Sequence, residues 1–146
     1  HVQARCRVRE DGVKVIDENL FQPIGSEFRF LSDESAEAGG QGLAPDAASY
    51  LAAGIGFCFM TQFGRYASIT KKQLDDYRIV QDLHFKPGGP GVLGDADPVE
   101  THVYLDTPEG EEFARKTLDI GERTCFLHAT CRTDLTPEVE VNVGER

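Results

Sequence analysis

The chain has 146 residues, of which 40% are hydrophobic and 27% are charged, proportions typical of a soluble globular domain. Its formal net charge of −10 argues against a nucleic-acid-binding surface, because such surfaces concentrate Lys and Arg. No apolar run reaches the roughly 18 residues of a membrane span, so we expect no membrane association. We expect a single domain over residues 1–146.

Cysteine usage indicates a reducing compartment. The chain has four cysteines, Cys6, Cys58, Cys125 and Cys131, which is far below the density of a disulfide scaffold. It shows no signal-peptide pattern of basic, apolar and small-residue regions. We therefore expect free thiols and a cytoplasmic location. For Cys6, which shares the parity of neighbouring apolar residues, and for Cys131, we expect only a packing role.

The first part of the chain is expected to form antiparallel strands. Apolar residues alternate with polar ones from Val2 to Val8, and the Asp-Gly pair in Glu10–Gly12 favours a turn. Val13–Ile16 is the expected partner strand. A further strand is expected over Glu27–Leu31, with Arg29 on the face opposite to its phenylalanine neighbours.

A long apolar helix is expected next. Residues 32–44 are glycine-rich and acidic, which is typical of a loop, and Pro45-Asp46 can begin a helix that runs to about Leu74. One face of this helix carries four residues: Leu51, Ile55, Cys58 and Gln62. Gly54 and Gly56 each cost roughly 1 kcal/mol of helix stability, which predicts that another element packs closely against them.

Strands and a second helix are expected in the C-terminal half. Alternation predicts strands over Tyr77–Phe85 and Thr101–Asp106, separated by a turn-rich segment. A helix is expected over Pro108–Thr124, with Thr107 as its N-cap, and a last strand over Val139–Val143. Sequential strands joined by short turns predict an α+β fold with antiparallel sheet.

Three kinds of chemistry fit the cysteines and histidines. Cys125-x-x-His128-x-x-Cys131 resembles half of a zinc site, but structural zinc needs four ligands and no second pair follows. A Cys–His hydrolase needs a base beside the sulfur, and no flanking sequence favours one of the histidines His84, His102 and His128.

The third kind is a pair of cysteines, Cys58 and Cys125, that meet in space and cycle between dithiol and disulfide. The attacking species must be a thiolate, and a thiol of pKa near 8.5 is only about 3% ionised at pH 7. A nearby guanidinium lowers the thiol pKa and cannot lose its own proton. Arg29 and Arg65 are the candidates for this partner.

Three segments carry a further signal. They are Gln22-Pro-Ile-Gly-Ser-Glu-Phe-Arg-Phe30, Ala52-Ala-Gly-Ile-Gly-Phe-Cys-Phe59 and Cys125-Phe-Leu-His-Ala-Thr-Cys-Arg132. In this order, with 66 residues between Cys58 and Cys125, they resemble the OsmC/Ohr family of osmotically inducible and organic hydroperoxide resistance proteins. The resemblance covers nearly the whole chain. It implies an intertwined α+β homodimer with antiparallel sheets around two long central helices and sites at the subunit interface.

The resemblance also implies a function, which is thiol-dependent peroxidase activity in the oxidative stress response. Cys58 matches the cysteine that attacks the hydroperoxide and becomes a sulfenic acid, and Cys125 matches the cysteine that forms a disulfide with it. Arg29 matches the catalytic arginine. A dithiol such as a lipoyl group would reset the enzyme. No cofactor, metal or nucleic acid is expected.

The sequence departs from the family pattern at one position. The family usually carries a glutamate ten residues before the reactive cysteine, where it orients the arginine, and position 48 here is alanine. Asp46 is the candidate replacement. The departure keeps open a protein of this fold that binds a small apolar or thiol-reactive ligand at the dimer interface without peroxidase activity. A structural homodimer with inert cysteines is the third possibility.

Overall fold

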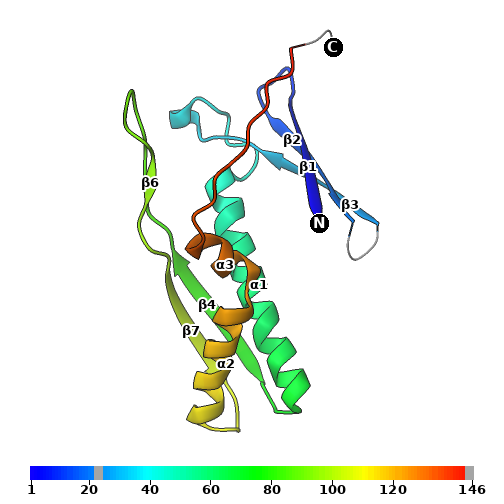
Figure 1. The fold of residues 1–146 in the computed structure, drawn as a ribbon, viewed down its shortest axis with the longest axis vertical. Helices are drawn as coiled ribbons and strands as arrows, with labels where there is room; N and C mark the ends of the chain where they lie inside the picture. The colour runs from blue at the N-terminus through cyan, green and yellow to red at the C-terminus, as the bar shows by residue number, and fades with distance from the viewer. Residues whose placement is uncertain (22–24, 144–146) are drawn as a thin grey trace. The chain divides into compact units, whose positions relative to one another are not determined.

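The computed structural model describes residues 1–21 and 25–143, and within them it contains antiparallel sheets and three α-helices (Figure 1). The predicted α+β class is therefore confirmed. The chain divides into two compact units, His1–Ala53 and Gly54–Arg146. Residues 22–24, which begin the segment 22–30 that resembles the OsmC/Ohr family, lie outside the described residues.

The N-terminal unit is built on a three-stranded antiparallel sheet in the order β1-β2-β3. Its strands are β1 (Val2–Val8), β2 (Lys14–Leu20) and β3 (Ser26–Ser32). The strand predictions are confirmed, and β2 extends beyond the predicted Ile16. The predicted turn between β1 and β2 is closed by a backbone hydrogen bond from Gly12 to Arg9, 3.1 Å long.

This sheet has one largely apolar face and one charged face. Directly paired residues project to the same side, so the register of the strands shows which residues share a face. The apolar face carries Val2, Ala4, Cys6, Val8, Ile16, Leu20, Phe28 and Phe30. The charged face carries Arg5, Arg7, Asp17, Glu27 and Arg29. The apolar face is poorly covered, with Val8 68% and Phe28 50% exposed. Cys6 lies on the apolar face as its parity predicts, but it is exposed, so the expected packing is absent within the described chain.

The loop after β3 is organised by a buried carboxylate. The carboxylate of Asp33, a residue only 3% exposed, accepts backbone hydrogen bonds from Glu34 (2.9 Å), Gln41 (3.1 Å) and Leu43 (3.1 Å). A short 3-10 helix, Ala36–Ala38, lies within the loop. The glycine-rich segment is therefore a loop as predicted, but it is closed on itself by Asp33.

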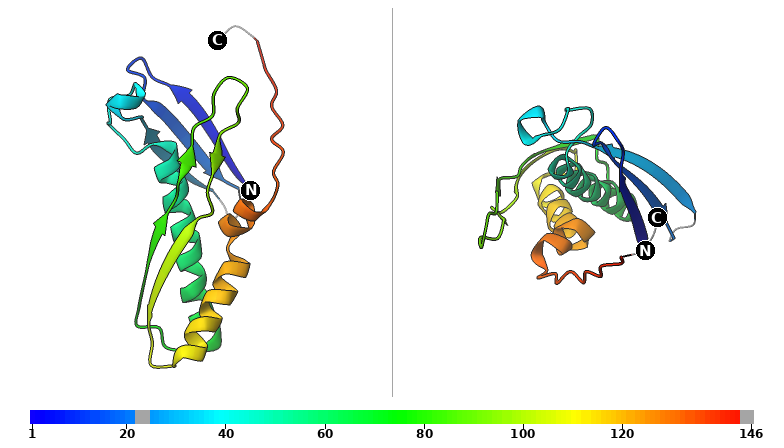
Figure 2. Two further views of the ribbon diagram at one scale, coloured as in Figure 1. Left: turned by 90° about the vertical axis from the view of Figure 1, so that its left-hand side faces the viewer. Right: turned by 90° about the horizontal axis from the view of Figure 1, so that it is seen from above.

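The helix α1 (Ala47–Thr70) continues from the N-terminal unit into the C-terminal unit. In the C-terminal unit, β4 (Asp76–Asp82) pairs with β7 (Glu100–Asp106), and the short strands β5 (Phe85–Lys86) and β6 (Asp95–Ala96) form a second pair. The helices α2 (Glu111–Thr124) and α3 (Phe126–Arg132) follow. Figure 2 shows α2 beside the C-terminal part of α1, with β4 and β7 packed on this helix pair.

Glycines allow the close packing of this unit. A Cβ atom on Gly54 would lie 3.1 Å from the Leu127 side chain, and one on Gly56 would lie 3.0 Å from Gln81. The close approach predicted at these positions is confirmed. On α2, a Cβ on Gly121 would lie 2.7 Å from the ring of Phe63, so α2 and α1 meet there at short range.

The helix α2 begins at Glu111 rather than at the predicted Pro108. Its N-cap is Gly110, whose φ of 85° lies in the left-handed region that glycine adopts readily. The Thr107 hydroxyl does not cap the helix. It donates to the carbonyl of Gln73, at 2.6 Å, in the segment that follows α1.

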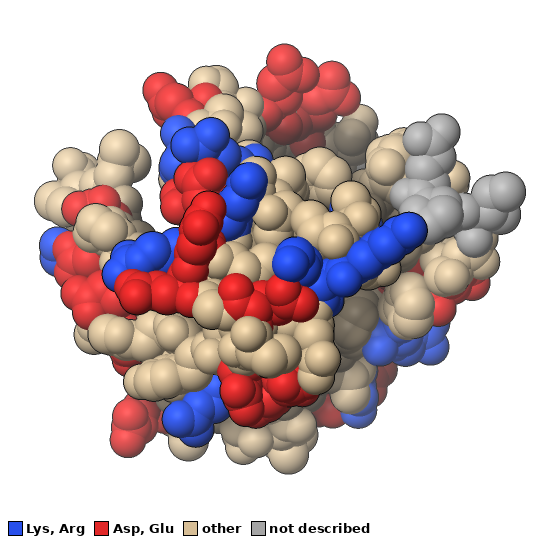
Figure 3. Space-filling model, turned by 90° about the horizontal axis from the view of Figure 1, so that it is seen from below, with Lys and Arg blue, Asp and Glu red and all other residues tan. Residues whose placement is uncertain are grey.

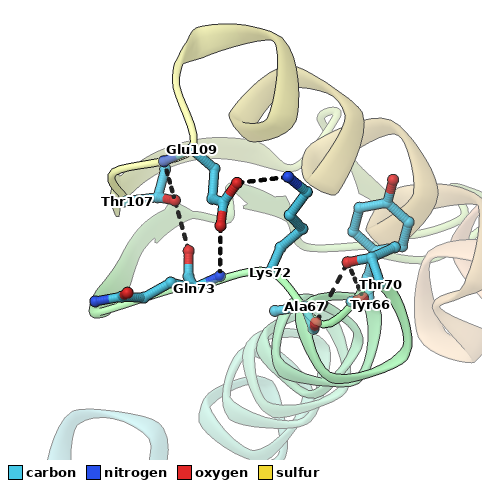
Figure 4. Close-up of polar contacts among 7 residues, drawn as sticks. All are labelled: Tyr66, Ala67, Thr70, Lys72, Gln73, Thr107 and Glu109. Carbon is cyan, nitrogen blue, oxygen red and sulfur yellow. Dashed lines mark hydrogen bonds and ion pairs between the residues drawn. The ribbon is translucent and has the colours of Figure 1, made fainter.

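Glu109 fixes the same junction, which Figure 4 shows in detail. Its carboxylate accepts from the Lys72 ammonium at 2.7 Å and from the backbone N–H of Gln73 at 3.1 Å. The segment before α2 is thus tied to the end of α1 by side chains, which explains why the first helical turn starts later than the cap pattern predicts.

The structure near the C-terminus differs from the prediction. The helix α3 occupies a segment to which we assigned no secondary structure. Residues 139–143, expected to be a strand, form none, and Val139, Val141 and Val143 are 81%, 83% and 95% exposed. Alternation alone does not make a strand, because its backbone groups need a pairing partner, and the rest of the described chain supplies none here. None of the described helices has the length and apolar character to cross a membrane.

Candidate thiol site

Cys58 and Cys125 come together in the core of the C-terminal unit. Cys58 lies in the middle of α1, and Cys125 is the single residue between α2 and α3. Cys125 is 1% exposed and forms a buried cluster with Phe59 and Phe63, against which the half-buried Cys58 packs. Both thiols are free, and the two cysteines share this one cluster.

The environment of Cys125 keeps its proton in place. Burial raises the pKa of the Cys125 thiol, and the hydrogen bond to Cys58 raises it further. The backbone N–H groups of His128 and Leu127 lower the pKa of Cys125 and so partly offset this rise. The Cys125 side chain makes no N-cap hydrogen bond to α3. Cys125 is therefore a protonated thiol at neutral pH.

Aromatic rings surround the sulfur atoms. The rings of Phe59 and Phe63 meet edge to face at 4.5 Å between centroids, and the imidazole of His128 meets Phe59 in the same way at 4.5 Å. The Nδ1 atom of His128 is buried and has no hydrogen-bond partner among the described residues. Burial lowers the pKa of His128, so its imidazole is uncharged at neutral pH.

Gln62 links the two elements that carry the cysteines. It is 5% exposed, its Nε2 donates to the carbonyl of Cys58 at 3.4 Å, and its Oε1 accepts from the Thr124 hydroxyl at 3.3 Å. Thr124 immediately precedes Cys125. We placed Gln62 on this helical face from the sequence but assigned it no role. A polar residue on an otherwise apolar face was the signal that could have indicated this link.

Arg29 lies in the N-terminal unit, on the charged face of the sheet. Its Nε donates to Oδ1 of Asp17 at 2.5 Å and its Nη2 donates to Oδ2 at 3.2 Å. Arg29, followed by Arg7, lowers the pKa of Asp17 to about 2. Sequence reasoning missed Asp17. The signal that could have found it is the strand register, since Asp17 and Arg29 pair directly across β2 and β3.

Asp46 is engaged at the start of α1. Its Oδ1 accepts from the backbone N–H of Ser49 at 2.7 Å, which is the geometry of a helix N-cap. The Ser49 hydroxyl and N–H together lower the pKa of Asp46. The structure thus places Asp46 on its own helix, whereas the carboxylate on Arg29 is that of Asp17. Arg65, the other candidate arginine, is exposed on α1.

The described residues contain no cluster of side chains that could bind a metal ion. Cys131 is exposed at the end of α3, and in residues 1–21 and 25–143 no three His, Cys, Asp or Glu side chains converge as a metal site would require.

The surface charge is of mixed sign. Figure 3 shows acidic and basic side chains interspersed over the face that it presents.

Comparison with known proteins supplies the family and the fold. A family model described as OsmC-like protein matches residues 39–140, which include Cys58 and Cys125 but not Arg29. Among curated proteins, no sequence matches this chain. Solved structures do match it.

An OsmC-like hydroperoxide resistance protein from Jannaschia sp. CCS1 is 21% identical, with a TM-score of 0.61 over 99% of this chain and 93% of that chain. An organic hydroperoxide resistance protein OsmC from Legionella pneumophila is 17% identical, with a TM-score of 0.66 over 90% and 89%. An OsmC-like protein from Mycoplasma pneumoniae is 13% identical, with a TM-score of 0.71 over 92% and 89%. The common fold is therefore the OsmC-like α+β fold.

Proposed function

Because the chain belongs to the OsmC-like protein family, we propose that it is a thiol-dependent peroxidase that reduces organic hydroperoxides. The observation that carries the proposal is the packing of Cys58 against the buried cluster that contains Cys125. The hydroperoxide resistance proteins from Jannaschia and Legionella, which share the fold, support the substrate class. We treat residues 1–146 as one functional domain.

In the first step, the Cys58 thiolate attacks the terminal oxygen of the hydroperoxide. An S–O bond forms, the O–O bond breaks, and the alkoxide takes a proton from water to leave as an alcohol. Cys58 becomes a sulfenic acid. Cys58 is assigned to this step because it is less buried than Cys125, whose pKa is raised by burial.

In the second step, the Cys125 sulfur attacks the sulfenic sulfur of Cys58. The disulfide forms, the S–O bond breaks, and water leaves with the thiol proton. The packing of both cysteines in one cluster supports this step. It also removes the sulfenic acid before a second peroxide can oxidise it to the irreversible sulfinic acid.

In the third step, a dithiol such as a lipoyl group reduces the disulfide. It gives up two electrons and two protons, becomes a cyclic disulfide, and restores both thiols. Four unpaired cysteines support a reducing compartment such as the cytoplasm.

Arg29 and a homodimer complete the proposal. The guanidinium of Arg29 would stabilise the thiolate and the negative charge that develops on the leaving oxygen. The apolar face of the sheet, with Val2 58% and Val8 68% exposed, supports a second subunit that covers it.

The test mixes reduced protein with cumene hydroperoxide and dihydrolipoamide. We expect catalytic loss of peroxide and, without dithiol, a Cys58–Cys125 crosslink in the mass spectrum. Cys125→Ser should consume one equivalent and stop as a sulfenic acid that dimedone traps. A crosslink without turnover would instead favour the ligand-binding function, which the engagement of Asp46 as a helix cap leaves open. No reaction at either cysteine would reject both.

A further inference from the structure

The contact between Arg29 and Asp17 is a bidentate ion pair and not a single hydrogen bond. The two residues are direct cross-strand partners in β3 and β2. Both carboxylate oxygens are used, with Nε to Oδ1 at 2.5 Å and Nη2 to Oδ2 at 3.2 Å. A bidentate pair fixes the plane and the direction of the guanidinium, which a single hydrogen bond does not.

The carboxylate of Asp17 is itself held from the other side. Arg7 of β1 donates from Nη1 to Oδ2 of Asp17 at 2.6 Å. Asp17 on the central strand therefore lies between an arginine on each neighbouring strand, and its side chain is 31% exposed against 64% for Arg29. Because Arg7 and Arg29 hold it from both sides, Asp17 cannot easily rotate away from Arg29.

We propose that Asp17 is the positioning residue for Arg29 in hydroperoxide reduction: it binds the Nε edge of the guanidinium and leaves the Nη1 end free of this pair. Nη1 makes no hydrogen bond within the described part of the chain. The inference rests on the proposed function, because Arg29 needs orienting only if it acts in the reaction.

Two other acids of the N-terminal unit are engaged by backbone N–H groups. Asp46 accepts from the backbone of Ser49 and caps α1. Asp33 is committed to the loop that it closes. Position 48 at the start of α1 is alanine and offers no carboxylate. Asp17 supplies the carboxylate from within the sheet, so Arg29 is oriented by a neighbouring strand and not by the helix.

A purely structural role for the pair predicts a different result. Exposed ion pairs contribute little to stability, because solvent screens them and ordering two side chains costs entropy. Asp17→Asn should therefore fold normally, and a change in activity would report orientation and not unfolding. Because the pKa of Asp17 is about 2, its carboxylate stays ionised throughout an assay between pH 5 and pH 9.

The experiment compares Asp17→Asn, Asp17→Glu and the matched control Arg9→Gln, which breaks the exposed Arg9–Asp11 pair beside the same strands. We expect kcat/KM for cumene hydroperoxide to fall about 10- to 100-fold in Asp17→Asn, as misorientation of a charge-stabilising group does, with partial recovery in Asp17→Glu. Arg9→Gln should match the wild type.

A double-mutant cycle separates positioning from any independent effect. In an Arg29→Lys background, Asp17→Asn should cause less than about a twofold further loss, because the bidentate pair is already gone. An active wild type that depends on Arg29 but tolerates Asp17→Asn would overturn the inference and leave the proposed function intact. A wild type that does not reduce peroxide would reject both.

Discussion

The N-terminal and C-terminal units hold their candidate functional groups by different forces. In the N-terminal unit, Arg29 is 64% exposed and is fixed by charge through Asp17. In the C-terminal unit, Cys125 is 1% exposed and is fixed by packing against Phe59 and Phe63. A close-packed apolar core holds buried side chains in place, whereas a bidentate carboxylate orients an exposed guanidinium without removing it from water. The difference predicts that the two groups respond to different perturbations.

The largest effect is expected at the nucleophile. Cys58→Ser should reduce kcat/KM for cumene hydroperoxide by at least about 10³-fold, because the hydroxyl is a far poorer nucleophile than a thiolate. The loss at Arg29→Lys should be smaller, because lysine keeps the charge and loses only the fork geometry. Steady-state kinetics on both variants, with circular dichroism as the folding control, would check the order. A larger loss at Arg29 would reverse the roles that we assign.

The next effect concerns packing in the C-terminal unit. Gly121→Val should lower the free energy of unfolding by about 1–3 kcal/mol, because its side chain would overlap the ring of Phe63, 2.7 Å from the Cβ position. Gly89→Val is the matched control, since no atom lies within 4 Å of its Cβ position. Urea unfolding measures both. Equal values in the two variants would mean that α1 and α2 do not meet closely at Gly121.

A more local effect is expected in the N-terminal unit. Asp33→Ala removes the acceptor for the backbone N–H groups of Gln41 and Leu43, so the loop over residues 34–43 should open while the C-terminal unit keeps its stability. Limited proteolysis should then cut within that loop faster than in the wild type. The variant Glu37→Gln, which changes an exposed acid of the same loop, should be cut at the wild-type rate.

The smallest effect is a pH dependence of the C-terminal unit. Burial lowers the pKa of His128, so above the unfolded pKa of about 6.5 the histidine is neutral in both states and its packing is fully retained. As pH falls below 6.5 the unfolded chain binds the proton more tightly, and stability decreases through the lowered folded pKa. Urea midpoints between pH 5 and pH 8 should show this slope. It should vanish in His128→Gln and persist in His84→Gln, which changes an exposed histidine.

The sequence predicted the elements of the N-terminal sheet because each strand has a clear period of two. What it did not reveal was the pairing of Asp17 with Arg29, which depends on the register of β2 against β3 and not on either strand alone. The predicted strand ended at Ile16, so Asp17 was left outside it. The acid that seemed available, Asp46, is used by its own helix.

In the C-terminal unit, the meeting of Cys58 and Cys125 was predicted, but the elements around it were only partly so. The helix α3 was not predicted, because its seven residues are too few to show an apolar period. Burial of Gln62 and His128 could not be foreseen, because it depends on how α1 meets α2 and α3. The valines at 139–143 show the converse, with a strand pattern but no partner.

The two exposed cysteines have a practical consequence. Cys6 lies in the N-terminal unit and Cys131 in the C-terminal unit, so each unit carries one exposed thiol. In a Cys58→Ser, Cys125→Ser protein, maleimide dyes would attach at these two points without any engineered residue. Energy transfer between them would then report the spacing of the sheet from α3 in single molecules, with and without a hydroperoxide analogue.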